Sequence, residues 1–110
     1  MTRSSGILLP VSALPGPCGI GDLGTAAREF IDFLAAAGQR YWQILPLNPP
    51  DSAHSPYLSA STFAGSTDLL SPEPLVKRGA LTLDEVRSVD WGGDPMRVDY
   101  GRVHAGKTAL

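Results

Sequence analysis

The feature that most constrains this chain is a strand–helix–strand pattern over residues 6–47. Residues 6–11 form a short apolar run typical of a strand buried on both faces, and residues 41–47 form a second run rich in aromatic and branched side chains. Between them lies an amphipathic helix, with Thr25 as its expected N-cap and Gly38 as its left-handed stop. This order predicts an α/β fold in which one crossover helix joins two parallel strands.

A polar loop over residues 48–65 leaves the C-terminal end of the second strand. Ligands bind at that end in both open parallel sheets and barrels. Beyond the loop, Pro72 and Gly79 bracket a short helix, and Thr82 and Glu85 have the spacing of a capping box for another. We interpret both short helices as local decoration.

The last predicted element is a helix that Asp99 caps. Its apolar positions, Val103 and Leu110, have only begun to repeat when the sequence stops in the third turn. We therefore expect residues 1–110 to be one segment of a longer protein, without a second domain boundary.

Composition excludes several classes of protein. The 110 residues carry 9 Lys and Arg against 11 Asp and Glu, so no basic excess is available to neutralise nucleic acid phosphates. No stretch approaches the roughly 20 apolar residues of a membrane span, and prolines interrupt the apolar run that follows Arg3. The single Cys18 cannot form an internal disulfide and lacks a nearby base. We expect a cytoplasmic protein without nucleic acid or membrane partners.

Three glycines, Gly19, Gly21 and Gly24, match the G-x-G-x-x-G pattern of dinucleotide sites between a strand and a helix. In such a site the first glycine follows the strand at once, whereas here residues 12–18 intervene and include two prolines. The ribose-binding acid expected at the end of the second strand is also missing, since Asp51 comes too late. A structural turn is the favoured interpretation, and a dinucleotide-binding domain remains the alternative.

The carboxylates offer no pair for chemistry on a glycosidic bond, which requires two carboxyl groups about 5 Å apart for a retaining mechanism. Glu29 and Asp32 belong to the solvent face of the helix, and the adjacent Asp84 and Glu85 point in different directions. Asp51 alone lies on the loop where a ligand is expected. We assign no catalytic residue to this chain.

The same loop contains Ser55-Pro56-Tyr57, in which a proline can hold a hydroxyl and an aromatic ring toward a cavity. A tyrosine ring offers its face to the C–H side of a sugar and its hydroxyl to sugar hydroxyls, although a rim tyrosine can equally serve in packing. His54 has no Cys or His partners at ligand spacing, so no metal site is predicted, and His104 is expected on a helix surface. Trp42 is expected in core packing.

Read in order, these segments resemble the amylomaltase, or disproportionating enzyme, family of 4-alpha-glucanotransferases. The resemblance covers nearly the whole chain and is carried by SALPGPCGIGDLG (12–24), YWQILPL (41–47), SPY (55–57), STFAG (61–65), and RVDY (97–100) ahead of Lys107. Each motif alone is weak, but together, in this order and spacing, they are specific. The chain departs from the family at Ala53-His54, where many members carry Gly-Asp.

The resemblance implies that the chain is the N-terminal portion of a (β/α)8 TIM barrel: its first two parallel strands and crossover helix, plus an irregular insertion. It implies transfer of alpha-1,4-glucan segments to the 4-hydroxyl of an acceptor sugar through a covalent glycosyl-enzyme, with a malto-oligosaccharide or alpha-glucan as substrate and no cofactor or metal. The catalytic carboxylates of the family lie beyond residue 110, so the isolated chain is expected to be inactive. Ser55 and Tyr57 match glucan-contacting positions of the family.

Two alternatives remain beside this hypothesis. One is the dinucleotide-binding domain of an oxidoreductase, which retained cofactor absorbance would reveal. The other is a small non-catalytic carbohydrate-binding module, which glucan affinity of the isolated chain would favour.

Overall fold

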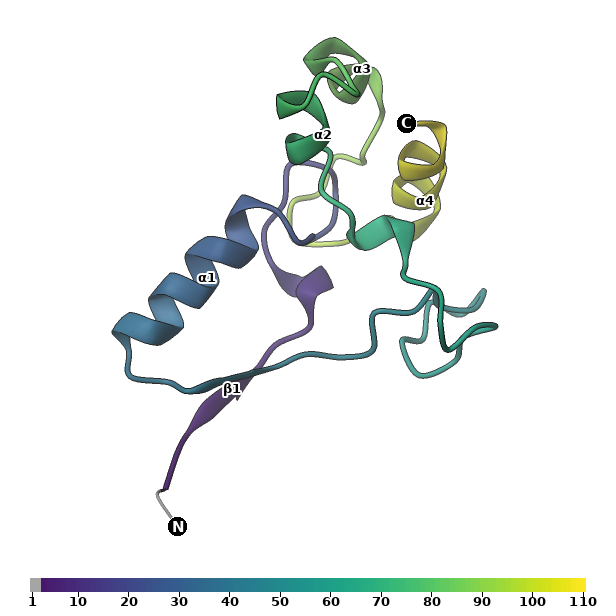
Figure 1. The fold of residues 1–110 in the computed structure, drawn as a ribbon. Coiled ribbons are helices and arrows are strands. Elements are labelled where there is room, and N and C mark those ends of the chain that lie inside the picture. The colour runs from purple at the N-terminus through teal and green to yellow at the C-terminus, as the bar shows by residue number, and fades with distance from the viewer. Residues whose placement is uncertain (1–2) are drawn as a thin grey trace.

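The computed structural model describes residues 3–110 and shows an α/β arrangement with two parallel strands (Figure 1). Strand β1 (Gly6–Leu8) pairs with β2 (Tyr41–Gln43), and Ile7 lies opposite Trp42. Helix α1 (Thr25–Ala36) connects them, and Gly38, two residues after its end, has a φ of 70° and is the expected left-handed stop. The predicted strand–helix–strand unit is confirmed.

Both strands are shorter than predicted. After Leu9 donates its N–H to the Gln43 carbonyl, Pro10 has no N–H to continue the ladder, and residues 11–13 turn into the 3-10 helix η1 (Val11–Ala13). Residues 44–47 therefore have no strand opposite them and do not belong to β2. The prediction that the first strand is buried on both faces is wrong for this chain, since Ile7 is 41% and Leu8 57% exposed.

Helix α1 is held to the strands by aromatic contacts. The Phe30 ring meets the Trp42 ring edge-on at 5.1 Å, and the Trp42 indole N–H donates to the Leu9 carbonyl at 2.8 Å. Trp42 therefore packs against α1, but it is only half-buried and does not belong to the buried core, contrary to the prediction. The predicted N-cap is wrong: Gly24 occupies the N-cap, and the Thr25 hydroxyl instead donates to Glu73 of a later helix.

The buried core lies outside the strand pair. It centres on the segment between η1 and α1 and on the last helix, α4 (Tyr100–Ala109). Val103 of α4 is fully buried, and Asp99 caps the helix by accepting the Arg102 N–H, as predicted. The other buried apolar residues are Val11, Leu14, Cys18, Ile20, Ala27 and Leu34.

Between β2 and α4 in the chain lie η2 (Thr67–Leu69), α2 (Glu73–Lys77) and α3 (Leu83–Ser88). The predicted capping box of Thr82 and Glu85 is present, with both reciprocal hydrogen bonds. Figure 1 shows α2, α3 and α4 gathered at one end and α1 with the strands at the other. The short helices are not mere decoration, because α2 is tied to α1 through Thr25–Glu73 and α3 holds the Trp91 indole N–H through the Val86 carbonyl. Among the described residues, no helix combines the length and apolar character needed to cross a bilayer.

Candidate functional site

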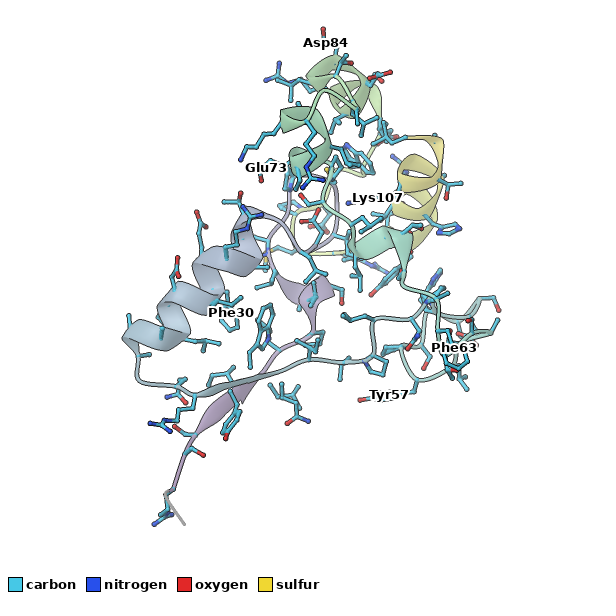
Figure 2. All side chains as sticks on the ribbon, viewed as in Figure 1. Phe30, Tyr57, Phe63, Glu73, Asp84 and Lys107 are labelled. Carbon is cyan, nitrogen blue, oxygen red and sulfur yellow. The ribbon has the colours of Figure 1, made fainter. Side chains whose placement is uncertain are left out.

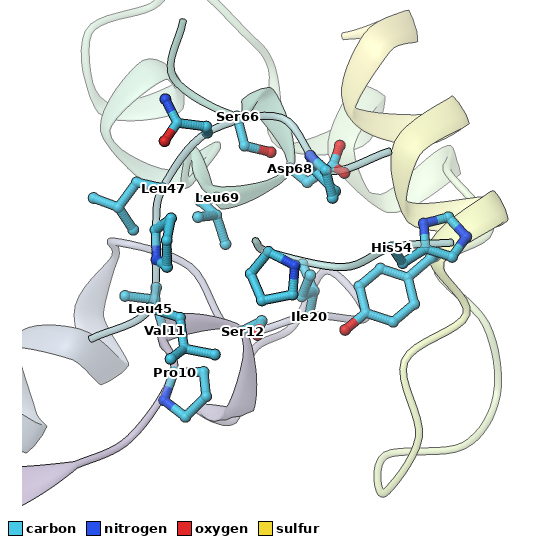
Figure 3. Close-up of a pocket in the computed structure, with 15 residues that line it drawn as sticks. Pro10, Val11, Ser12, Ile20, Leu45, Leu47, His54, Ser66, Asp68 and Leu69 are labelled. Carbon is cyan, nitrogen blue, oxygen red and sulfur yellow. The ribbon is translucent and has the colours of Figure 1, made fainter. Parts of the chain in front are cut away.

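A cavity of about 230 Å³ opens where the chain leaves the C-terminal ends of both strands. Its walls come from residues just after β1, from residues 45–50 after β2, and from η2. Figure 3 shows His54 at the end of this cavity next to α4 and Leu47 and Leu69 on the other side. The site thus occupies the strand end at which the sequence placed ligand binding.

The 48–65 loop lines part of the cavity and contains a turn over residues 51–58, here called the 51–58 turn. Asp51 donates its N–H to the Leu58 carbonyl at 2.8 Å, which closes the turn at its base. The Asp51 carboxylate accepts N–H bonds from Ala53 at 3.1 Å and Ser55 at 3.3 Å. The one acid predicted at the ligand loop is therefore engaged by its own backbone.

Ser55 and Tyr57, the predicted substrate contacts, lie on this turn but do not line the cavity. Their neighbours His54 and Pro56 do. Ser55 is half-buried, and its hydroxyl accepts the Tyr57 N–H at 3.4 Å. The Tyr57 ring is 72% exposed and projects from the loop, free to meet a ligand or another part of a larger protein (Figure 2). Their glucan-binding role stays a prediction.

Two histidines connect the site to α4. His54 stacks on Tyr100, with ring centroids 4.6 Å apart and planes 12° from parallel. His104 places Nδ1 3.0 Å from the carboxylate of Asp68, a buried residue of η2. His104 lies on the helix surface as predicted, but it has a specific acidic partner that the sequence did not indicate.

Sequence reasoning missed a buried ion pair between α4 and the segment that precedes α1. Lys107 Nζ is 3.2 Å from Asp22 Oδ2, and the two side chains are only 3% and 6% exposed. The ammonium also donates to the Leu70 carbonyl and lies 5.9 Å from the centre of the Trp91 ring. Figure 2 shows Lys107 reaching from α4 toward the segment that precedes α1. The two residues are 85 positions apart, so no local sequence pattern predicts that they pair.

The glycine-rich segment is a structural turn. Gly19 has a φ of 71°, and a Cβ there would lie 2.3 Å from the Trp91 carbonyl oxygen. At the start of α1, the Asp22 carboxylate accepts the Gly24 N–H at 3.0 Å. A dinucleotide site uses such free N–H groups at a helix N-terminus to bind pyrophosphate, and here the chain's own carboxylate takes that place.

The other acids serve structural roles. Glu73 pairs with Lys77, Asp90 and Asp99 pair with Arg102, and Glu85 and Asp94 accept backbone N–H groups. Hydrogen bonds from Lys77 and Thr25 lower the pKa of Glu73, and the Gly92 N–H together with Arg102 lowers the pKa of Asp90. Glu29, Asp32 and Asp84 are exposed, as predicted. Within residues 3–110, no group of three or more His, Cys, Asp or Glu is placed to hold a metal ion.

Cys18 is buried against the same core. Burial raises the pKa of its thiol, and the nearby Lys107 ammonium only partly offsets that effect. The reactive thiolate is therefore disfavoured, in line with the predicted inert role.

Comparison with known proteins identifies the family. Residues 9–110 match the family model described as 4-alpha-glucanotransferase. The chain belongs to the 4-alpha-glucanotransferase family. The interpretation as an oxidoreductase domain is thereby excluded.

Relatives and a solved structure agree with this assignment. The chain is 47% identical over 107 residues to a 4-alpha-glucanotransferase of Thermus thermophilus, covering 97% of this chain and 20% of the relative. It is 52% identical over 100 residues to the Aquifex aeolicus 4-alpha-glucanotransferase, covering 89% of this chain and 21% of the relative. The solved amylomaltase from Streptococcus agalactiae in complex with acarbose matches with a TM-score of 0.93 at 38% identity, covering 98% of this chain and 22% of that one. The chain spans about a fifth of the length of these relatives.

Proposed function

We propose that this chain is the N-terminal segment of a 4-alpha-glucanotransferase that transfers alpha-1,4-glucan segments to the 4-hydroxyl of an acceptor sugar by retaining double displacement. The observation that carries the proposal is the agreement of 98% of the chain with a solved amylomaltase at a TM-score of 0.93. The substrate is a malto-oligosaccharide or alpha-glucan, in keeping with the acarbose that the solved amylomaltase binds. The enzyme acts in the cytoplasm.

In this proposal β1 and β2 are the first two strands of a (β/α)8 barrel, and α1 is its first outer helix. Residues 1–110 then form one incomplete part of the catalytic barrel. The exposed apolar side chains of the strand–helix unit support it, since they include Leu8, Phe33 and Tyr41 at 57%, 63% and 63% exposure. In a complete barrel such residues are covered by neighbouring strands and helices.

The role of the segment is to bind substrate while carboxylates from the rest of the enzyme perform the chemistry. Retention requires a nucleophile and an acid/base about 5 Å apart. The acids of this segment are held in caps, turns and ion pairs or lie on exposed helix faces. Ser55 and Tyr57 supply glucan contacts at the strand end where barrel active sites are built.

The test is Tyr57→Ala in the full-length protein that contains this segment. If the ring supports a bound glucose near the scissile bond, kcat/KM for disproportionation of maltotriose falls about 10-fold or more, equivalent to at least about 1.4 kcal/mol of transition-state stabilisation. The melting temperature changes little, because a ring that is 72% exposed contributes little packing.

Two further variants sharpen this experiment. Tyr57→Phe separates the ring face from the hydroxyl. Asp84→Ala removes another exposed side chain, on α3 at the other end of the molecule from Tyr57 (Figure 2), and leaves kcat/KM unchanged. A full-length wild-type protein without transfer activity refutes the proposed function. An active enzyme in which Tyr57→Ala lowers only the melting temperature refutes the glucan contact alone.

A further inference from the structure

The 51–58 turn is closed within itself. Its hydrogen bonds run from Asp51 to Leu58, from His54 to Asp51, from Leu58 to Ser55, and from Ala53 and Ser55 to the Asp51 carboxylate. All of these join residues of the turn to one another. They fix its internal shape, and none of them joins the turn to another element.

The stack of His54 on Tyr100 joins the turn to α4. The rings are 4.6 Å apart at an interplanar angle of 12°, and they join the turn to the first residue of α4. His54 also has a φ of 57°, the one positive φ of a residue other than glycine within residues 3–110. Histidine is among the few residue types enriched in this left-handed conformation, which still costs free energy that a tertiary contact must offset.

Helix α4 is a firm base for this contact. Val103 is fully buried, Lys107 pairs with Asp22 inside the core, and His104 pairs with Asp68 of η2. These three contacts fix Tyr100 relative to the segments that follow β1 and β2. A turn docked on Tyr100 is therefore placed relative to the strand ends.

We propose that His54 is a positioning residue: its stack on Tyr100 sets the orientation in which the 51–58 turn presents Ser55 and Tyr57 to a glucan. The inference rests on the proposed function, because the contacts that it positions are the proposed glucan contacts. It also gives a role to the histidine that directly precedes Ser55 in this chain.

The experiment is a double-mutant cycle in the full-length protein that contains this segment. His54→Gly removes the ring but allows the left-handed backbone, so the turn keeps its shape and loses its docking. We expect His54→Gly to lower kcat/KM for maltotriose about 10-fold, and to cause a clearly smaller loss when Tyr57→Ala is already present, because only Ser55 is then left to be misplaced. His54→Phe keeps an aromatic stack and retains activity near that of the wild type.

A spectroscopic measurement tests the positioning apart from activity. In protein labelled with 3-fluorotyrosine, the Tyr100 and Tyr57 resonances should both move in His54→Gly, and both should stay close to the wild-type positions in His54→Phe. This measurement decides the inference even for a full-length protein without transfer activity, which would refute the proposed function separately.

Three results would overturn the inference. One is a loss in the double variant equal to the product of the two single losses, which would mean that His54 acts independently of Tyr57. Another is a His54→Phe variant that melts at the wild-type temperature but is as impaired as His54→Gly, which would show that stacking is not what matters. The third is a Tyr57 resonance that does not respond when the Tyr100 resonance moves.

Discussion

Replacing Lys107 with methionine removes the cation that joins α4 to the segment before α1. Methionine preserves most of the aliphatic stem, so little volume is lost, but the bonds to Asp22 and to the Leu70 carbonyl disappear. The Asp22 carboxylate, 6% exposed, is left with the Gly24 N–H and no cation. Removing one partner of a buried pair costs about 3–5 kcal/mol, and we take about 3 kcal/mol here because that remaining hydrogen bond still solvates the carboxylate.

Amide hydrogen exchange in the full-length protein measures this cost locally. A loss of about 3 kcal/mol corresponds to exchange about 150-fold faster, since each 1.4 kcal/mol is a factor of ten. The informative amides are Gly24, bonded to the Asp22 carboxylate, and Val103, bonded to the Asp99 carbonyl in α4. Both should accelerate together if the pair holds the two segments as one unit.

Lys77→Met is the matched control, because it removes a lysine from an ion pair with Glu73 that is 67% and 40% exposed. It should leave the Gly24 and Val103 amides unchanged, as expected for a solvated pair. The double variant Lys107→Met with Asp22→Asn should recover most of the protection, since no unpaired charge remains buried. Equal exchange in Lys107→Met and Lys77→Met would refute the reasoning, as would a double variant less protected than Lys107→Met alone.

Three further predictions concern other parts of the chain. Gly38→Ala should lower the free energy of unfolding by about 1 kcal/mol through its left-handed backbone alone, because nothing lies within 4 Å of the added Cβ. Gly19→Ala should lower the melting temperature clearly more than Gly38→Ala, because its added Cβ would clash with the Trp91 carbonyl. Since burial raises the pKa of Cys18, the contribution of this thiol to the free energy of unfolding should be constant below about pH 8.5 and fall as the pH rises above that value. Alkylation of the native thiol should be far slower than alkylation in urea, and equal rates would contradict this. The isolated 110-residue chain should release no glucose from maltotriose above a protein-free control. It should also aggregate or be only partly ordered, and a sharp thermal transition of the monomer at micromolar concentration would show that the strand–helix unit folds on its own.

The local elements were predictable because their signals are local. The Thr82–Glu85 capping box, the Asp99 cap and the left-handed Gly38 each depend on side chains within a few residues of a helix end, and all three are present. The predicted N-cap at Thr25 was wrong because a distant contact decided it. Its hydroxyl found an acceptor in Glu73, 48 positions away, and Gly24 became the N-cap instead.

Most of the site was beyond sequence reasoning because its contacts are between distant segments. The loop and its strand end were predicted from the parallel topology, and so was the presence of Ser55 and Tyr57 on that loop. His54 stacks on Tyr100 and His104 pairs with Asp68. Both contacts join residues that are far apart in the sequence and close only in the folded structure. An unusual residue at a special backbone position, such as His54 at a φ of 57°, is also invisible until the turn is seen.

The ion pair between Asp22 and Lys107 has a consequence for how the chain acquires its shape during synthesis. Its partners are 85 positions apart, and the bonds of α4 to Asp68 and Leu70 span 36 and 37. During translation the strands, α1 and the 48–65 loop are therefore synthesised well before α4. Until α4 emerges, Asp22 lacks its cation and His54 lacks the Tyr100 ring, so the contacts that join the earlier elements to α4 are the last of those described here to form.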